Sequence, residues 1–203
     1  LDKKSGHLVR KIDILDVMNW LGTVLSSRRS AEIALVYYDT PVWEAFARAK
    51  DNLSELPHRA QSNNSVVFWR KPTDEELQNF FNIVQESGGS EPGLINGEAA
   101  RERAPWFTGV NPCAEILLGN KSFCNLSEVD LSKFRDDSGG LERALYVIAR
   151  ANYRQTLVNL DDGILQRTWH ENNEHLRLCG VGLTGITTRD DISKHDYKRF
   201  KNI

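Results

Sequence analysis

Apolar residues recur along this chain at spacings that predict helices alternating with short strands. Within Ile12–Leu25 they fall three and four positions apart, which places most of them on one helical face. The run Ala31–Tyr38 is almost continuously apolar and predicts a buried strand. Pro41 then begins a second helix, and a polar connector covers Asp51–Asn64. The inner side of this second helix is expected to carry Val42, Phe46 and Ala49.

The same pattern is repeated from residue 65 onward. The short apolar segment Ser65–Trp69 predicts a strand, and Thr73 begins the helix that follows it. Thr73 is a good N-cap residue, and Glu76 stands three positions later, which is the spacing of a capping box. Gly88 and Gly89 end this helix. Its buried stripe is expected to consist of Leu77, Phe80, Phe81 and Val84.

The second half of the chain continues the alternation. Pro92–Asn96 is a short extended piece, and Val110–Val129 mixes Pro, Gly and Asn with β-forming residues, which predicts loop and strand. Helices are expected over Leu141–Leu157 and Ile164–Leu176, and Gly180–Ile186 predicts a glycine-rich strand or turn. Strands alternating with helices predict an α/β fold with a largely parallel sheet. The inner side of the first long helix is expected to carry Ala144, Leu145, Ile148 and Ala149.

Composition places the chain among globular proteins. Of its 203 residues, 40% are apolar and 27% are charged, which is enough to bury a core. The 26 basic and 28 acidic side chains give a net charge of -2, which argues against a field built to attract nucleic acid. No apolar run approaches the length of a membrane span, and no apolar region follows Leu1–Lys4 as it would in a signal peptide.

Three further features concern the origin of the chain. Its three cysteines are too few for a disulfide-stapled secreted domain, so reduced thiols in the cytoplasm are the better interpretation. The chain starts at Leu1 rather than at Met, and it ends on a highly charged stretch, Arg189–Ile203. We therefore expect it to be part of a longer protein.

The stretch Asn111–Glu115, which reads Asn-Pro-Cys-Ala-Glu, carries the strongest chemical signal. A thiol can act as a nucleophile, redox partner, metal ligand or hydrogen-atom carrier, although a lone cysteine is more often a small core residue. Residues two apart in an extended segment point to the same face, so Asn111, Cys113 and Glu115 would line up together. A carboxylate and an amide beside a thiol can deprotonate and orient a hydroxyl-bearing substrate. The apolar residues after Glu115 predict a buried rather than a solvated carboxylate.

Other candidate groups carry weaker signals. Cys124 lies too far from Cys113 for a zinc knuckle, so a redox role beside Cys113 is the better interpretation. Cys179 is expected to pack under the tight turn that follows it, and Gly180–Ile186 lacks the third glycine of a dinucleotide-binding fingerprint. The remaining candidates are expected to have structural roles. The histidines expected on the surface or at helix ends are His58, His170 and His175. The tryptophans expected in the core are Trp43, Trp69, Trp106 and Trp169.

These residues together resemble a known family. Asn111–Leu118, followed by Phe123–Val129, is similar to the active-site finger loop of ribonucleotide reductases, and more specifically to that of the class II, adenosylcobalamin-dependent form. The short gap between Cys113 and Cys124 favours class II, because the second cysteine typically lies further along in the diiron-dependent class I. The resemblance covers about Val9–Ile186. Its further blocks, in the expected order, are Arg28–Leu35, Ser62–Val66, Glu91–Asn96 and Gly180–Ile186.

The resemblance implies part of a ten-stranded α/β barrel with the finger loop threaded through its centre. The partial barrel would cover residues 1–188, and residues 189–203 would be a divergent or truncated charged tail. The implied cofactor is adenosylcobalamin. The implied partners are a ribonucleotide substrate, nucleotide effectors and a thioredoxin-type reductant. The implied enzyme is cytoplasmic, can form a homodimer, and binds neither nucleic acid nor membrane.

The resemblance also implies roles for four residues. Cys113 would be the thiyl-radical residue that takes the 3′-hydrogen of a ribonucleotide. Glu115 would be the base acting on the 3′-hydroxyl, and Asn111 would hydrogen-bond the ribose hydroxyls. Cys124 would be one half of the dithiol that reduces the 2′ position and is oxidised to a disulfide.

Several features depart from the family pattern. The partner of Cys124 should lie upstream, but no cysteine precedes Cys113, and Cys179 has no counterpart. Ser26 and Ser27 stand where the family usually has Gly-Asn before its Arg-Arg pair. We therefore expect this polypeptide alone not to be a competent reductase. A class I large-subunit fragment and a catalytically dead nucleotide-binding remnant stay open as alternatives.

Overall fold

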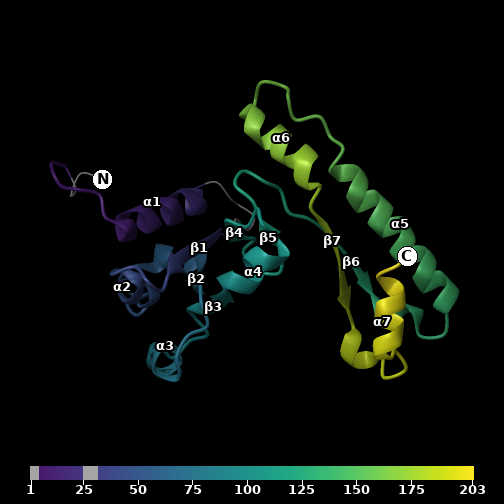
Figure 1. Ribbon diagram of the computed structural model, residues 1–203, viewed down its shortest axis with the longest axis horizontal. Coiled ribbons are helices and arrows are strands. Elements are labelled where there is room, and N and C mark those ends of the chain that lie inside the picture. Colours follow the sequence, from purple (N-terminus) through teal and green to yellow (C-terminus); the bar gives the residue numbers. More distant parts are fainter. Residues whose placement is uncertain (1–4, 25–31) are drawn as a thin grey trace. The chain divides into compact units, whose positions relative to one another are not determined.

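The computed structural model describes residues 5–24 and 32–203 and divides into two compact units, Leu1–Leu117 and Leu118–Ile203 (Figure 1). Each unit contains parallel strands covered by helices, which confirms the predicted α/β class. Residues 25–31, which include the end of the predicted helix Ile12–Leu25, the Ser-Ser pair and the start of the block Arg28–Leu35, lie outside the described residues. No helix in the described part is both long and apolar enough to cross a membrane.

The predicted helices and strands of the first unit occur in the predicted order, and two helices that were not predicted, Pro57–Gln61 and Gly97–Arg103, stand among them. In the sequence they are α1 (Lys11–Val24), β1 (Glu32–Tyr37), α2 (Trp43–Ala47), the 3-10 helix η2 (Pro57–Gln61), β2 (Ser62–Phe68), α3 (Asp74–Ser87), β3 (Gly93–Asn96), α4 (Gly97–Arg103), β4 (Gly109–Val110) and β5 (Leu117–Leu118).

A parallel sheet with the order β1-β2-β3 forms the middle of the first unit. Its register places Val66 of β2 opposite Val36 of β1 and Leu94 of β3. Successive residues of a strand point to opposite faces. One face packs against α1, α2 and α3, and the other packs against α4 and residues 104–117. The central strand is therefore covered on both sides.

Strand β2 begins three residues before the predicted strand Ser65–Trp69, so the polar connector is shorter than expected. Its first residues are polar, which hid them from a hydrophobic pattern. Both Ser62 and Asn64 are nevertheless buried, and hydrogen bonds satisfy several of their polar groups, although Asn64 Nδ2 has no partner. The Ser62 hydroxyl donates to Asn64 Oδ1 at 2.8 Å, and the Asn64 N–H donates to the Glu91 carboxylate at 3.0 Å. Hydrogen bonding of this kind allows polar groups to be buried.

Helix α3 begins after Thr73 and ends before Gly88, as predicted. The capping box is confirmed, since the Glu76 N–H donates to Thr73 Oγ1 at 3.2 Å and the Thr73 N–H donates to the Glu76 carboxylate at 2.8 Å. Gly88 has a φ of 67°, a left-handed conformation that suits glycine. Hydrogen bonds from Arg70, and then from the Thr73 N–H, hold the pKa of Glu76 at about 2.

The buried face of α3 differs from the predicted stripe at one position. Phe80 and Ile83 are 1% and 0% exposed, whereas Phe81 is 54% exposed. Leu77 and Val84 are half-buried. The prediction for Phe81 is therefore wrong, and Ile83 takes its place. Positions 80, 83 and 84 lie on one side of a helix, while position 81 is turned away by about 100°.

Helix α1 forms where it was predicted, but its apolar residues are not buried as a set. Leu15 is buried, whereas Ile14 and Met18 are more than half exposed. The most buried side chain is polar: Asn19 is fully buried, and neither its Nδ2 nor its Oδ1 has a partner. The expected apolar face is therefore only partly used in packing.

Charged and aromatic contacts attach α1 to η2. The Asp16 carboxylate accepts hydrogen bonds from Arg59 at 2.6 and 2.8 Å and contacts His58 Nε2 at 2.9 Å. The ring of Trp20 stacks on His58 with centroids 4.8 Å apart. His58 is thus buried, contrary to the surface position expected for it. The hydrogen bond from Arg59 lowers the pKa of Asp16, and burial opposes this effect.

The second unit has fewer elements. In the sequence they are β6 (Asn125–Asp130), the 3-10 helix η3 (Leu131–Phe134), α5 (Ser138–Gln155), α6 (Arg167–Leu176), β7 (Cys179–Thr184), the 3-10 helix η4 (Ile186–Thr188) and α7 (Lys194–Phe200).

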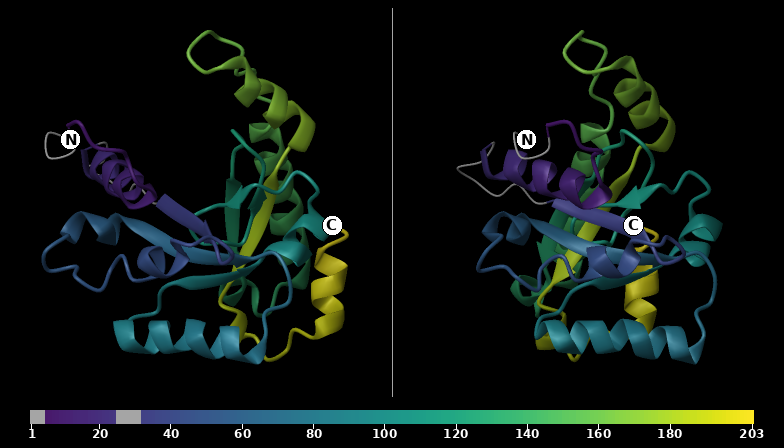
Figure 2. Two further views of the ribbon diagram at one scale, coloured as in Figure 1. Left: turned by 60° about the vertical axis from the view of Figure 1, so that its left-hand side comes forward. Right: turned by 90° about the vertical axis from the view of Figure 1, so that its left-hand side faces the viewer.

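Strands β6 and β7 pair in parallel, and α5 lies along them (Figures 1 and 2). Their core contains Val129, Leu141 and Leu145. Helix α5 starts three residues before the predicted Leu141, because Asp137 caps it by accepting a hydrogen bond from the Gly140 N–H at 2.7 Å. A short local hydrogen bond therefore extends the helix through two glycines.

The segment after residue 188 packs onto the second unit. Arg189 is buried, and its guanidinium donates to the Leu131 carbonyl at 2.8 Å and to the Asp191 carboxylate at 2.7 Å. This hydrogen bond with Arg189 lowers the pKa of Asp191. Tyr197 and Phe200 of α7 pack against the core of the unit.

Replacing Ile83 with alanine should destabilise the first unit strongly. Ile83 is fully buried between α3 and the sheet, so its truncation leaves a cavity and should lower the free energy of unfolding by about 2–5 kcal/mol. Phe81→Ala is the matched control on the same helix and should cost less than half as much, because Phe81 is mostly exposed. Urea unfolding followed by circular dichroism measures both. Equal losses for the two variants would contradict the assigned face of α3.

Asp16→Asn should weaken the attachment of α1 in a pH-dependent way. The folded state lowers the pKa of Asp16, so its charged form stabilises the fold above the ordinary carboxyl range, and this stability is lost as the pH falls through the folded pKa. At pH 7 the variant should lose about 1–3 kcal/mol of unfolding free energy. The difference from the unmodified chain should shrink as the pH falls below the ordinary carboxyl pKa of about 3.9 and through the lowered folded-state pKa. Urea titrations across this pH range test it, and a pH-independent difference would refute the ion-pair explanation.

Candidate functional site

The motif Asn111–Glu115 forms a closed turn between β4 and β5. Asn111 is 3% exposed and closes the turn with both its backbone and its side chain. Its N–H donates to the Ile116 carbonyl at 3.3 Å, and its Oδ1 accepts from the Ile116 N–H at 2.9 Å. Inside this loop the Ala114 N–H donates to the Asn111 carbonyl at 2.8 Å. The turn is therefore held at its base by one buried asparagine.

The central sheet supports the turn from outside. Asn63 of β2 donates from Nδ2 to the Pro112 carbonyl at 2.6 Å. The next residue, Asn64, donates its N–H to Glu91, which also forms an ion pair with Lys50 at 2.7 Å. Two blocks of the family resemblance, Ser62–Val66 and Glu91–Asn96, thus lie together at the start of β2. No pattern of apolar residues indicated Asn63, although its position in a family block could have drawn attention to it.

The turn changes the predicted arrangement of the three motif side chains. Asn111 points inward and is buried, whereas Cys113 and Glu115 are exposed. The expectation that all three line one extended face is wrong, because Ala114 adopts a φ of 66° and breaks the two-residue alternation. The predicted burial of Glu115 is also wrong. Cys113 directly precedes this left-handed residue, and Glu115 directly follows it.

Cys124 belongs to the second unit and stands one residue before β6. It is exposed. On its N-terminal side, the ring of Phe123 packs against Trp169 of α6 with centroids 5.0 Å apart. On its C-terminal side, Asn125 donates from Nδ2 to the Leu178 carbonyl at 3.0 Å. Cys124 therefore lies between two anchored neighbours.

Two minor expectations about side-chain burial need correction. Cys179 is the first residue of β7 and is exposed, not packed under a turn, because Gly180–Thr184 continues as a strand. Trp106 is 40% exposed rather than part of the core. Among the described residues, which include all three cysteines, there is no disulfide and no group of side chains that could hold a metal ion.

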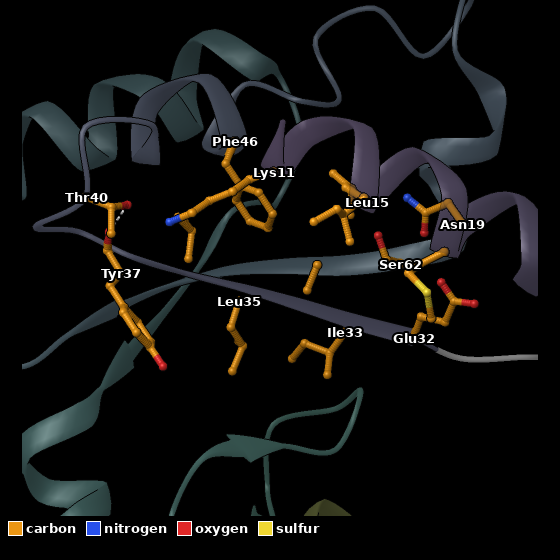
Figure 3. A pocket seen from close by; sticks show the side chains of 14 residues that line it. Lys11, Leu15, Asn19, Glu32, Ile33, Leu35, Tyr37, Thr40, Phe46 and Ser62 are labelled. Atoms are coloured by element: carbon orange, nitrogen blue, oxygen red, sulfur yellow. Dashed lines mark hydrogen bonds between the residues drawn. The ribbon is translucent and has the colours of Figure 1, made fainter. Parts of the chain in front are cut away.

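A separate pocket of about 570 Å³ lies between α1 and β1 in the first unit (Figure 3). Leu15, Phe46 and neighbouring apolar side chains line most of it, and Asn19 and Glu32 stand at one end. Burial raises the pKa of Glu32. No residue of the motif Asn111–Glu115 lines this pocket, so it is distinct from the candidate site.

Comparison with known proteins confirms the resemblance to class II reductases. No protein-family model matches the chain. It is 30% identical to the adenosylcobalamin-dependent ribonucleoside-triphosphate reductase of Levilactobacillus brevis and 31% identical to that of Lacticaseibacillus paracasei. Both alignments cover 92% of this chain and 25% of the relative. The chain therefore spans about a quarter of the length of the curated relatives it matches.

The fold is also similar to a solved structure. A crystal structure of a B12-dependent, class II ribonucleotide reductase superposes with a TM-score of 0.70 and 26% sequence identity. The match covers 92% of this chain and 26% of that chain. The mixed α/β architecture with parallel sheets is thus the architecture of a segment of a class II reductase.

Ala114→Gly should stabilise the turn that carries Cys113. An alanine in the left-handed conformation costs about 1–2 kcal/mol, and replacing it with glycine removes this cost. About half of the benefit is lost again, because glycine has more conformational freedom in the unfolded chain. The free energy of unfolding of the first unit should therefore rise by about 0.5–1 kcal/mol. Ala45→Gly in α2 is the control and should lower it, because Ala45 is an exposed helical residue. A loss of stability in Ala114→Gly would contradict the turn geometry.

Proposed function

We propose that this chain forms part of the catalytic chain of an adenosylcobalamin-dependent ribonucleotide reductase. The observation that carries the proposal is similarity over 92% of the chain, in sequence and in fold, to proteins named as such reductases. The exposed thiol of Cys113, on a turn braced by the central sheet, supports it. The complete enzyme would be cytoplasmic and would act on ribonucleotides, with nucleotide effectors and a thioredoxin-type reductant as partners.

The two units would be parts of one ten-stranded α/β barrel. Parallel strands with helices on the outside are the components of such a barrel. The closed turn Asn111–Ile116 and the segment that leads to Cys124 would belong to the finger loop at its centre. Enclosure by the barrel would keep a radical away from water and from side reactions.

Cys113 would transfer the hydrogen atom. Adenosylcobalamin supplies an organic radical when it is bound, and the residue that receives this radical must present its sulfur to the outside of the loop. Cys113 fits this requirement because it is exposed and forms no disulfide. As a thiyl radical it would take the 3′-hydrogen of the ribose. None of the described residues is assigned to hold the cofactor itself.

Asn111 and Glu115 would act on the ribose hydroxyls. The Oδ1 atom of Asn111 is used inside the turn, so its Nδ2 is the group that would donate to a hydroxyl. Glu115 is exposed two residues beyond Cys113, and its carboxylate would accept the proton of the 3′-hydroxyl. Removing this proton makes loss of the 2′-hydroxyl easier once the 3′-radical has formed.

Cys124 would provide half of the reducing equivalents. The 2′-hydroxyl leaves as water, and a new C–H bond forms at the 2′ carbon. Two thiols give up two electrons and two protons and become one disulfide. The second thiol would come from a cysteine upstream in the complete protein, because none precedes Cys113 in this chain. Cys124 is exposed, as exchange with a second sulfur requires.

Cys113→Ser in a complete reductase that carries this chain should abolish ribonucleotide reduction. Serine keeps the size of the side chain but cannot form a comparable radical, so activity should fall at least about 1,000-fold. Deoxynucleotide formation, measured with and without adenosylcobalamin, provides the assay. Cys179→Ser is the matched control and should retain activity, because Cys179 is an exposed thiol without an assigned role.

Three results would count against the proposal. Activity without adenosylcobalamin would favour the class I alternative. Unchanged activity in Cys113→Ser would remove the thiyl role, and robust activity of the isolated 203-residue chain would contradict the requirement for a second cysteine.

A further inference from the structure

The segment that carries Cys124 is anchored by contacts on both sides. Before it, Asn172 of α6 donates from Nδ2 to the Asn120 carbonyl at 2.5 Å, and Phe123 packs on Trp169. These contacts hold the approach to the cysteine against α6. On the other side of the cysteine, where β6 begins, Asn125 donates from its own Nδ2 to the Leu178 carbonyl at 3.0 Å.

Asn152 of α5 adds a further hold on the backbone of Asn125. Its side chain is 0% exposed, and its Nδ2 donates to two backbone carbonyls, that of Asn125 at 3.0 Å and that of Gly180 at 2.6 Å. Asn125 is the residue after Cys124, and Gly180 lies on the neighbouring strand β7. One amide therefore ties the first residue of β6 to β7 and ties both strands to α5.

Burying the amide of Asn152 costs free energy that an apolar side chain in the same position would not cost. Its Oδ1 is buried and has no hydrogen-bond partner. An unsatisfied buried acceptor destabilises a fold, and an apolar side chain of the same shape is often tolerated in its place. A role that needs the two donated hydrogen bonds explains why an amide stands here.

We infer that Asn152 is a positioning residue for Cys124, which it holds through the backbone of Asn125. The inference rests on the proposed role of Cys124 as half of the reducing dithiol. A disulfide forms only within a narrow range of Cα separations and side-chain directions, so the strand that presents the thiol must be held in place. The bridge from Asn152 fixes the backbone one residue from that thiol.

A nitroxide label on Cys124 would test the inference in the 203-residue chain, with Cys113 and Cys179 replaced by serine so that only one thiol reacts. Asn152→Leu keeps the branched outline of the side chain, although it is bulkier, and removes both hydrogen bonds. The rotational correlation time of the label, read from its electron paramagnetic resonance spectrum, should fall by about twofold or more. Asn152→Ala should have the same effect and covers the case in which leucine does not fit.

Thr156→Val is the matched control, at the C-cap of the same helix. Thr156 is also fully buried, and its hydroxyl donates to the Tyr153 carbonyl of α5 at 2.7 Å, so valine removes a buried hydrogen bond that does not involve β6. The label should keep its mobility in this variant. An unchanged label in a folded Asn152 variant, or an equal change in Thr156→Val, would overturn the inference.

The outcome is separable from that of the reductase assay. If the label responds but the complete protein reduces no ribonucleotide, the proposed function fails and Asn152 still positions the thiol. If the complete protein is active and the label does not respond, only the role of Asn152 fails.

Discussion

Burial of the central strand β2 on both faces is the constraint on which the first unit depends. Val66 and Val67 point to opposite sides and are almost completely buried, one against the helical core and the other beside α4. A strand covered in this way has little freedom to shift, because a slip of one residue would exchange its two faces. Gly97 shows how close the packing is, since a Cβ there would lie 2.7 Å from the Val67 side chain. The start of β2 is consequently a firm base for the turn above it.

Side-chain amides connect these rigid elements to the segments that carry the thiols. Asn63 joins β2 to the turn of Cys113, and Asn111 closes that turn. In the second unit, Asn152 joins α5 to the strand that follows Cys124. An amide offers donors and an acceptor without a charge, so it can be buried at lower cost than a carboxylate or an ammonium group. Both thiols stay exposed while the backbone beside them is held.

Local signals in the sequence predicted much of the architecture. The order of helices and strands follows from apolar spacing, and the start of α3 follows from Thr73 and Glu76, which cap the helix through hydrogen bonds to each other's backbone. Such features depend on residues a few positions apart. The turn motif Asn111–Glu115 likewise indicated a candidate chemistry through its family resemblance, although its geometry differed from the extended form first assumed.

Features that depend on distant partners could not be predicted in this way. The polar start of β2 is buried because Asn64 meets Glu91 across the fold, and His58 is buried because Asp16 and Trp20 reach it from α1. No short window contains both members of these pairs.

The sequence by itself determined the alternation of elements, the helix caps and the candidate thiol chemistry, because each of these is encoded within a few neighbouring residues. The tertiary structure alone decided that Ile83 rather than Phe81 is buried on α3, that Glu115 and Cys179 are exposed, and that Asn152 spans two strands. Burial and cross-strand hydrogen bonds are properties of groups brought together by folding. The spacing of apolar residues predicts which face of an element is buried. It does not predict which residue of another element each side chain contacts, because that depends on how the elements pack.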